Sequence, residues 1–192
     1  RPTHFAGVAL VVSKAMNLIR PDVALFGQKD AQQLAVIRTF VRDLDMPVRI
    51  QAVEIVRDSD GVALSSRNQY LSEEERVHAR SLSRAIDEAR AAAALGVPLD
   101  EVLRAASSVL EAEEGVVPDY VAIVDDDDFT LLAGSGSAAE QVDEDSREKV
   151  LEAAATQGSL RARILLAARV GATRLIDNAD VVISVAGGAR HE

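Results

Sequence analysis

Two short segments of the sequence place polar side chains where a phosphate group could bind. In the first, Gly27 and Lys29 stand between a short apolar run and the start of a predicted helix. The free N–H groups at a helix N-terminus attract anions, and a lysine beside them adds a full positive charge. Taken alone, this motif is more often an ordinary strand-to-helix turn with a solvated lysine, so it indicates a phosphate site only together with other evidence.

The second segment, Arg57–Asn68, contains two adjacent serines and an arginine: Ser65, Ser66 and Arg67. Hydroxyl groups donate hydrogen bonds to phosphate oxygens, and a guanidinium group can bind two of these oxygens at once. The aspartates earlier in the segment are more typical of a solvated turn than of a metal site. Both segments follow predicted strands, and the carboxyl ends of parallel strands meet at one edge of a sheet. The two segments together therefore predict a nucleotide site.

The distribution of charge supports an anion site in the first third of the chain. The 192 residues include 21 Lys/Arg and 31 Asp/Glu, which gives a net charge of −10. Residues 1–68 carry 9 Lys/Arg against 7 Asp/Glu (net +2), whereas residues 69–192 carry 12 against 24 (net −12). An anionic ligand is therefore expected on residues 1–68. Nonspecific binding of nucleic acid needs a basic surface and is not expected.

The composition also excludes several classes of protein. There is no cysteine, so disulfides and thiolate metal sites are excluded. No apolar run approaches the roughly 18 residues of a membrane-spanning helix, so we expect a cytoplasmic protein without a membrane partner. The chain opens at Arg1, without an initiator methionine and in the middle of a pattern, so we expect a fragment of a longer protein.

The spacing of apolar residues predicts an α/β unit at the start of the chain. A helix is predicted over residues 4–19, a strand over 22–26, a helix capped by Asp30, and a strand over 48–56. This strand–helix–strand order is typical of a parallel sheet.

The pattern changes after residue 68. Ser72 and Glu75 predict a capping box for a long helix that ends at Gly96, and Asp100 is expected to cap a second helix. Further strands are predicted over 120–124, 164–170 and 173–176, with Gly171 at the last turn. Between these strands we expect an acidic insertion around 125–158, flexible from residue 134 and carrying one short helix. The predicted domains are therefore 1–68 and 69–192.

Four motifs make the sequence resemble the pantothenate synthetases (pantoate–β-alanine ligases). They are Arg1–Val8, Phe26–Leu34, Asp60–Asn68 and Gly171–Asn178. They occur in family order and cover roughly the C-terminal two-thirds of such an enzyme. The resemblance implies an incomplete Rossmann-like (HUP-type) nucleotide-binding domain, followed by a smaller α+β lid domain with a short antiparallel sheet. The first domain should then expose the apolar flank on which further strands pair.

The resemblance also implies an activity. Family members use ATP, with Mg²⁺, to convert pantoate into pantoyl adenylate and pyrophosphate, and the amine of β-alanine then displaces AMP to give pantothenate. A homodimer is the expected assembly. The resemblance assigns ATP binding to Gly27, Gln28, Lys29, Asp30, Val56, Leu64, Ser65, Ser66 and Arg67. Catalysis is expected from Lys29, Ser65, Ser66 and Arg67.

The remaining expectations concern pantoate and the histidines. Gln33 is expected to bind pantoate. Arg1 and His4 are candidates to support the site, although His4 is as well explained as a structural histidine at the chain entry. His78 and His191 are expected at the surface, and the histidine spacing shows no metal-ligand pattern.

Two alternative functions stay open. The family's His-x-Gly-His motif is absent from these residues, so the chain could be a non-catalytic truncated fragment or an interaction module that needs the missing part. It could also be another nucleotidylyltransferase of the same superfold, because a fold does not determine a reaction.

Overall fold

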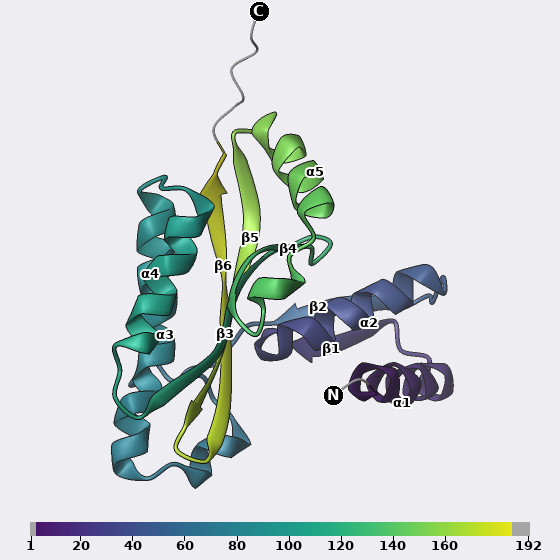
Figure 1. Cartoon of the computed structure of the whole chain (residues 1–192). Helices are drawn as coiled ribbons and strands as arrows, with labels where there is room; N and C mark the ends of the chain where they lie inside the picture. Colours follow the sequence, from purple (N-terminus) through teal and green to yellow (C-terminus); the bar gives the residue numbers. More distant parts are fainter. Residues whose placement is uncertain (1–2, 186–192) are drawn as a thin grey trace, which may run out of the picture. The chain divides into compact units, whose positions relative to one another are not determined.

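A computed structural model describes residues 3–185 of the chain and shows two compact units (Figure 1). The units divide between Ile55 and Val56. This division comes earlier than the domain boundary predicted at residue 68. The difference arises because the segment that follows Val56 is bound to the second unit, where Arg57 pairs with Asp177.

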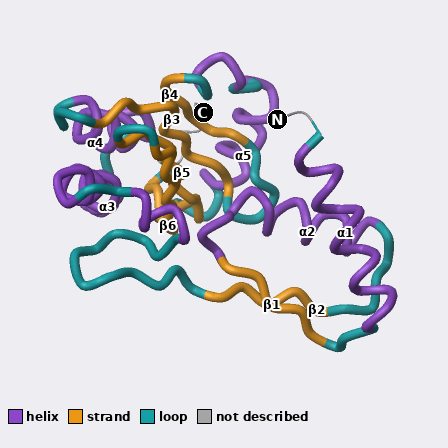
Figure 2. The backbone as a smooth tube through the Cα atoms, turned by 90° about the horizontal axis from the view of Figure 1, so that it is seen from below, coloured by secondary structure: helices purple, strands orange, loops and turns teal. Residues whose placement is uncertain are grey.

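The first unit is a parallel strand pair with two helices. Its elements are α1 (His4–Ile19), β1 (Val23–Gly27), the short 3₁₀ helix η1 (Gln28–Asp30), α2 (Ala31–Asp43) and β2 (Arg49–Val53). Figure 2 shows β1 and β2 side by side, and α1 beside α2. These elements confirm the predicted strand–helix–strand order. The second strand ends at Val53 rather than at residue 56, because its partner β1 ends opposite it at Gly27.

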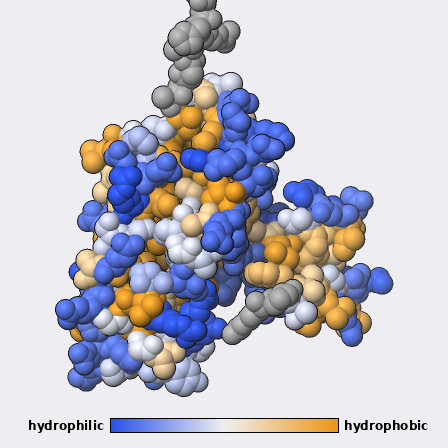
Figure 3. Space-filling view, in the orientation of Figure 1, coloured by the Kyte–Doolittle hydropathy of each residue, from blue (hydrophilic) through white to orange (hydrophobic). Residues whose placement is uncertain are grey.

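The core of the first unit is small and leaves apolar surface uncovered. Ile37 is fully buried, and Met16 and Val41 are buried beside it. Large apolar side chains on α1 and the two strands are exposed: Leu10, Val11, Leu18, Ile19, Leu25 and Val53. Figure 3 shows the hydrophobic surface of this unit in orange. Within the described residues β1 pairs only with β2, so the sheet of this unit has unpaired edges, and the expectation of an exposed flank for further strands is confirmed.

The second unit is an antiparallel sheet covered on one face by two long helices. Its helices are α3 (Glu73–Ala94), α4 (Leu99–Glu111) and α5 (Glu144–Ala155), with the 3₁₀ helices η2 (Ser66–Tyr70) and η3 (Ala139–Gln141). Its strands are β3 (Val116–Asp125), β4 (Leu131–Gly136), β5 (Ser159–Val170) and β6 (Thr173–Ser184). The strands lie in the order β4-β3-β5-β6, and every pair is antiparallel.

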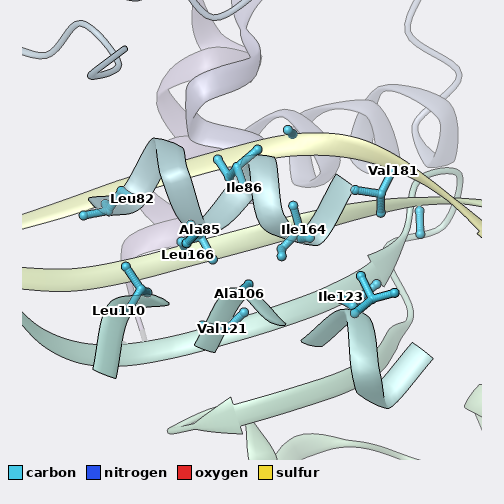
Figure 4. Packing of buried hydrophobic residues seen from close by; sticks show 14 of the residues in the cluster. Leu82, Ala85, Ile86, Ala106, Leu110, Val121, Ile123, Ile164, Leu166 and Val181 are labelled. Carbon is cyan, nitrogen blue, oxygen red and sulfur yellow. The ribbon is translucent and has the colours of Figure 1, made fainter. Parts of the chain in front are cut away.

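The core of the second unit lies between α3, α4 and the sheet. Figure 4 shows Leu82, Ala85 and Ile86 of α3 packed toward the sheet, with Ile164 and Leu166 of β5 facing them. Ile164 and Leu166 point to the helix-covered face of β5, but Arg163, Leu165 and Ala167 on the opposite face are buried as well, so β5 is buried on both faces. The predicted fold class is therefore confirmed: a parallel α/β unit is followed by a unit with an antiparallel sheet.

The N-termini of α3 and α4 were both predicted from capping residues, and one prediction is confirmed while the other is wrong. The capping box is confirmed, because the Glu75 N–H donates to Ser72 Oγ at 3.1 Å and the Ser72 N–H donates to Glu75 Oε2 at 2.8 Å. The prediction that Asp100 caps the next helix is wrong. Pro98 is the N-cap residue of α4, and Asp100 lies in its first turn. A carboxylate there favours the helix through the helix dipole rather than through a cap.

The prediction of a flexible insertion from residue 134 to residue 158 is wrong in part. This stretch contains the end of β4, all of η3 and all of α5, the one short helix that was expected. Apolar content is low because most of this stretch is exposed, with only Ala138 and Ala154 buried, but one glycine in it has a packing role. A Cβ atom on Gly134 would lie 2.8 Å from the carbonyl oxygen of Ala138. Glycine is therefore required by this close approach rather than by flexibility.

The acidic run after β3 has a structural role. Asp126 accepts a hydrogen bond from Arg163 Nε at 2.7 Å, and Asp127 accepts one from Arg161 Nη2 at 2.7 Å. Both arginines belong to β5, which begins at Ser159 rather than at residue 164 as predicted. Arginine interrupts the apolar pattern at the start of β5, so the sequence alone does not show a strand there.

Candidate nucleotide-binding site

In the first unit, the candidate site lies at the carboxyl edge of the parallel strand pair. Gly27 ends β1 opposite Val53, which ends β2. The prediction that the two strands end at the same sheet edge is therefore confirmed. Ligands of open α/β sheets bind beyond the carboxyl ends of the strands, where the loops leave the sheet.

The turn after β1 carries the candidate lysine. Gly27 has extended backbone angles, and a Cβ atom built on it would meet nothing within 4 Å. Open space therefore lies beside the Gly27 backbone. Gln28 and Lys29 follow in η1 and are half-buried, whereas Asp30 is exposed.

The start of α2 carries the candidate pantoate residue. Asp30 occupies the N-cap position as predicted, but its side chain makes no capping hydrogen bond. The first N–H groups of α2 are therefore not satisfied by this carboxylate. Gln33 is half-buried in the first turn of α2. It thus belongs to the same strand-to-helix connection as Lys29.

Of the two residues expected to support the site, Arg1 and His4, the structure describes His4. His4 is exposed at the start of α1 and lies edge-to-face with Phe5, with ring centroids 5.2 Å apart. This contact fits the structural alternative for His4. Arg1 lies outside the described residues.

In the second unit, the segment Ser65–Arg67 follows directly after buried residues. Val62 and Ala63 are buried at 6% and 5% exposure, whereas Leu64 is 46% exposed. Ser65 is the N-cap residue of η2, where its Oγ accepts a hydrogen bond from the Arg67 N–H at 3.3 Å. Ser66 and Arg67 are exposed. Arg67 Nη1 donates to the Arg174 carbonyl of β6 at 3.4 Å. Two hydroxyl groups and a guanidinium group therefore lie on a short segment that is tied at its start and, through Arg67, to β6.

Backbone hydrogen bonds fold the chain before this segment into a small hairpin. Arg57 and Ala63 form an antiparallel bridge, and the Leu64 N–H donates to the Val56 carbonyl at 2.9 Å. Within the described part of the chain, no group accepts a hydrogen bond from the Val56 N–H. Val56 as a residue is 61% exposed.

An ion-pair cluster holds the tip of the hairpin. Arg76 of α3 donates from Nη2 to Asp58 Oδ2 at 2.6 Å and from Nε to Asp60 Oδ2 at 2.7 Å. The hydrogen bond from Arg76 holds the pKa of the Asp60 carboxyl well below its usual range. Asp60 also accepts from the Val62 N–H. The aspartates that the sequence indicated as a solvated turn are therefore fixed to α3.

The candidate residues fall into two groups, one in each unit. Gly27, Gln28, Lys29, Asp30 and Gln33 lie together at the start of α2 in the first unit. Val56 and the segment Leu64–Arg67 lie in the second unit. Each group is contiguous in space within its own unit.

Sequence reasoning missed the residues that anchor the second group. These are Arg57, Arg76 and Asp177, none of which was assigned a role. A signal was present for Asp177, because it lies in the last motif of the family resemblance although no ligand contact was expected of it.

His78 also differs from its prediction. It was expected at the surface, but its side chain is 22% exposed, and its Nδ1 lies 2.8 Å from Glu113 Oε1. Glu113 is also bound by Arg84. The hydrogen bond with His78, and to a smaller extent the contact with Arg84, lower the pKa of the Glu113 carboxyl. His191 lies outside the described residues.

Residues 3–185 also bear on two other classes of protein, those that bind a metal ion and those that span a membrane. No three His, Asp or Glu side chains in that range gather where they could hold a metal ion. None of the helices in that range is long and apolar enough to cross a membrane.

Comparison with known proteins agrees with this architecture. A solved pantothenate synthetase from Thermus thermophilus has 40% sequence identity and a TM-score of 0.75, covering 93% of this chain and 56% of that chain. A pantoate–β-alanine ligase from Francisella tularensis, solved with β,γ-ATP and β-alanine, has 23% identity and a TM-score of 0.57. The chain therefore has the HUP-type α/β architecture of these ligase structures.

Sequence relatives identify the family. The model of the pantoate–β-alanine ligase family matches residues 1–180. A pantothenate synthetase from Rhizorhabdus wittichii is 49% identical over 179 residues, which are 93% of this chain and 55% of that protein. One from Thermobifida fusca is 47% identical over 187 residues, 95% of this chain and 55% of that protein. The chain belongs to the pantoate–β-alanine ligase family, and it spans about half the length of the curated relatives it matches.

Proposed function

We propose that the protein containing this chain is an ATP-dependent ligase that joins pantoate to β-alanine. The observation that carries the proposal is that the chain contains both a lysine turn at a parallel sheet edge and an anchored Ser65-Ser66-Arg67 segment. Both features offer phosphate-binding groups, and family membership supplies the reaction.

Each of the two steps has a clear chemical demand. In the first step, a pantoate carboxylate oxygen attacks the α-phosphorus of ATP, and the bond to the β-phosphate oxygen breaks to release pyrophosphate. In the second step, the β-alanine amine attacks the activated carbonyl carbon, AMP leaves, and the amine loses a proton. Charge accumulates on the leaving pyrophosphate in the first step, and fixed cations stabilise it there.

The chain's own residues meet these demands as follows. Lys29 and Arg67 neutralise phosphate charge, and the hydroxyl groups of Ser65 and Ser66 donate to phosphate oxygens. The Val56 N–H binds the adenine edge. Gln33 donates a hydrogen bond to pantoate and orients its carboxylate. Gly27 leaves space for the nucleotide to approach the backbone of Gln28 and Asp30.

Mg²⁺ fits this site as a partner of ATP rather than of the protein. The described residues offer hydroxyl, lysine and arginine groups for the phosphates and no cluster of carboxylates for a metal ion. Mg²⁺ retains several waters and binds phosphate oxygens in such sites. When bound, it supplies further neutralisation of the phosphate charge.

The experiment uses the longest gene product that contains these residues. Release of pyrophosphate is measured with ATP and pantoate, and release of AMP is then measured after β-alanine is added. A ligase releases pyrophosphate only with pantoate and releases AMP only with β-alanine. AMP release that does not depend on β-alanine would favour another nucleotidylyltransferase.

The same assay on the 192-residue chain decides the non-catalytic alternative. The chain spans about half of its relatives, so it is the appropriate second sample. Activity of the longer product, with no activity of the 192-residue chain, would show that these residues need the rest of the protein.

We further propose a homodimer located in the cytoplasm. Both proposals rest on the family resemblance. Light scattering of the longest gene product tests the dimer, because a mass of one chain would contradict it. Cell fractionation tests the location.

A further inference from the structure

Arg57 and Asp177 form a forked ion pair that connects the hairpin between Val56 and Leu64 to the sheet of the second unit. Arg57 Nη1 donates to Asp177 Oδ2 at 2.6 Å, and Nη2 donates to Oδ1 at 3.0 Å. The Asp177 side chain is 2% exposed, and the Arg57 side chain is 29% exposed. A forked geometry fixes both the distance and the orientation of a guanidinium group.

The pair reaches both ends of the hairpin that precedes the phosphate-binding segment. Arg57 Nη1 also donates to the Gly61 carbonyl at 3.0 Å, so one side chain connects the hairpin tip to β6. The backbone of Arg57 bridges Ala63, which lies two positions before Ser65. A change in the position of Arg57 would therefore move the start of the Ser65–Arg67 segment.

Asp177 is itself held in place from within the sheet. Its Oδ1 accepts a hydrogen bond from the Asn178 N–H at 2.8 Å. The Asn178 side chain accepts one from Arg163 Nη1 at 2.9 Å, and Arg163 is buried. Asp177 and Asn178 are thus held in place on β6 by these hydrogen bonds, and Asp177 in turn holds Arg57.

We infer that Arg57 and Asp177 are positioning residues that hold the Ser65-Ser66-Arg67 segment in the geometry that binds the phosphates of ATP. The ligand contact in this inference rests on the proposed function. The mechanical part, in which the ion pair orders the segment, stands on the hydrogen bonds alone.

The first test measures adenylation in the longest gene product. Arg57→Gln and Asp177→Asn each lower the single-turnover rate of pyrophosphate release by roughly 10–100-fold, because small misplacements of binding groups are costly in rate. The rate of the β-alanine step, measured from supplied pantoyl adenylate, changes by less than about twofold, because only the first step needs the triphosphate of ATP to be held in place. A general loss of structure would lower both steps.

Two further variants show that the pair acts as a unit. The double variant Arg57→Gln/Asp177→Asn is no slower than the slower single variant, because each change removes the same interaction. Arg57→Lys keeps the charge but loses the fork, so its rate lies between those of wild type and Arg57→Gln. If Arg57→Gln does not fold, the rate of Arg57→Lys shows whether the forked geometry matters for pyrophosphate release.

The matched control is Arg161→Gln, which breaks the pair between Arg161 of β5 and Asp127 of the turn after β3. Arg161 and its partner Asp127 are 71% and 73% exposed, and neither contacts the hairpin. We expect pyrophosphate release at the wild-type rate in this variant.

The second test does not require activity. Hydrogen exchange of the 192-residue chain, followed by mass spectrometry, reports on the peptide that covers residues 64–70. This peptide exchanges faster in Arg57→Gln than in wild type or Arg161→Gln, because its anchor is lost. If the peptide exchanges faster in Arg57→Gln but the wild-type longest gene product releases no pyrophosphate, the proposed function is rejected. The inference that the ion pair orders the segment would still hold. Wild-type exchange and wild-type pyrophosphate release in folded Arg57→Gln and Arg57→Lys would overturn the inference.

Discussion

Arg76 binds Asp60 through two hydrogen bonds, from Nε to Oδ2 at 2.7 Å and from Nη2 to Oδ1 at 2.8 Å. The pair joins the turn of the hairpin between Val56 and Leu64 to the first turn of α3, so the hairpin is fixed to a helix that covers the sheet. Because Arg76 favours the ionised carboxylate, the pKa of Asp60 lies well below its ordinary value.

This lowered pKa predicts a specific loss of stability in acid. Unfolded Asp60 takes up its proton near pH 4, whereas folded Asp60 does so only at lower pH, so the unfolded state binds more protons in between. The stabilisation is therefore complete above about pH 5 and falls as the pH drops through that window. Urea unfolding at pH 5 and pH 3 should show a smaller pH dependence for Asp60→Asn than for wild type.

The partner variant checks the cause of that effect. Arg76→Gln removes the donor but keeps the Asp60 carboxyl, and it should reduce the same pH dependence. If both variants kept the wild-type difference between pH 5 and pH 3, the ion pair would not be the source of acid sensitivity.

A second prediction concerns the lysine turn. Lys29→Ala in the longest gene product should lower the single-turnover rate of pyrophosphate release by about 10²–10³-fold, the scale for loss of one preorganised donor. Lys14→Ala is the matched control, because Lys14 is an exposed lysine on α1 of the same unit. Unchanged pyrophosphate release in Lys29→Ala would remove the role proposed for this residue.

A third prediction compares two arginines on β5. Arg163 has a side chain with 10% exposure, and it binds both Asp126 and Asn178. Arg163→Ala leaves these groups without their cation and should lower the free energy of unfolding by about 3 kcal/mol. Arg161→Ala, at an exposed pair, should lower it by at most about 1 kcal/mol. Urea unfolding measures both, and equal losses would show that burial does not decide the contribution.

A fourth prediction separates two glycines by the space around them. A Cβ on Gly134 would meet backbone atoms of Ala138 at 2.8–2.9 Å, so Gly134→Ala should destabilise the protein by about 1–3 kcal/mol. Gly7 lies within α1, and a Cβ there meets nothing within 4 Å. Gly7→Ala should therefore stabilise the helix by about 0.5–1 kcal/mol. Circular dichroism in urea measures both changes, and the prediction fails if Gly134→Ala is neutral.

Much of the local structure was predictable because it depends on residues close together in the sequence. The helix at residues 4–19 follows from apolar spacing and a terminating proline, and the Ser72–Glu75 capping box follows from a three-residue spacing. β4 was missed because glycine and serine fill much of it, and its buried position depends on pairing with β3.

By itself, the sequence determined the strand–helix–strand order of the first unit, the family and the two phosphate-binding candidates around Lys29 and Ser65–Arg67. Those features are short motifs, whose meaning is contained in neighbouring residues. Only the tertiary structure decided what holds the second candidate in place, since Arg57 and Asp177 are 120 positions apart. A sequence shows which charges exist, but an ion pair forms only where the fold brings them within hydrogen-bond distance, and the fold also decides how far the pair is removed from water.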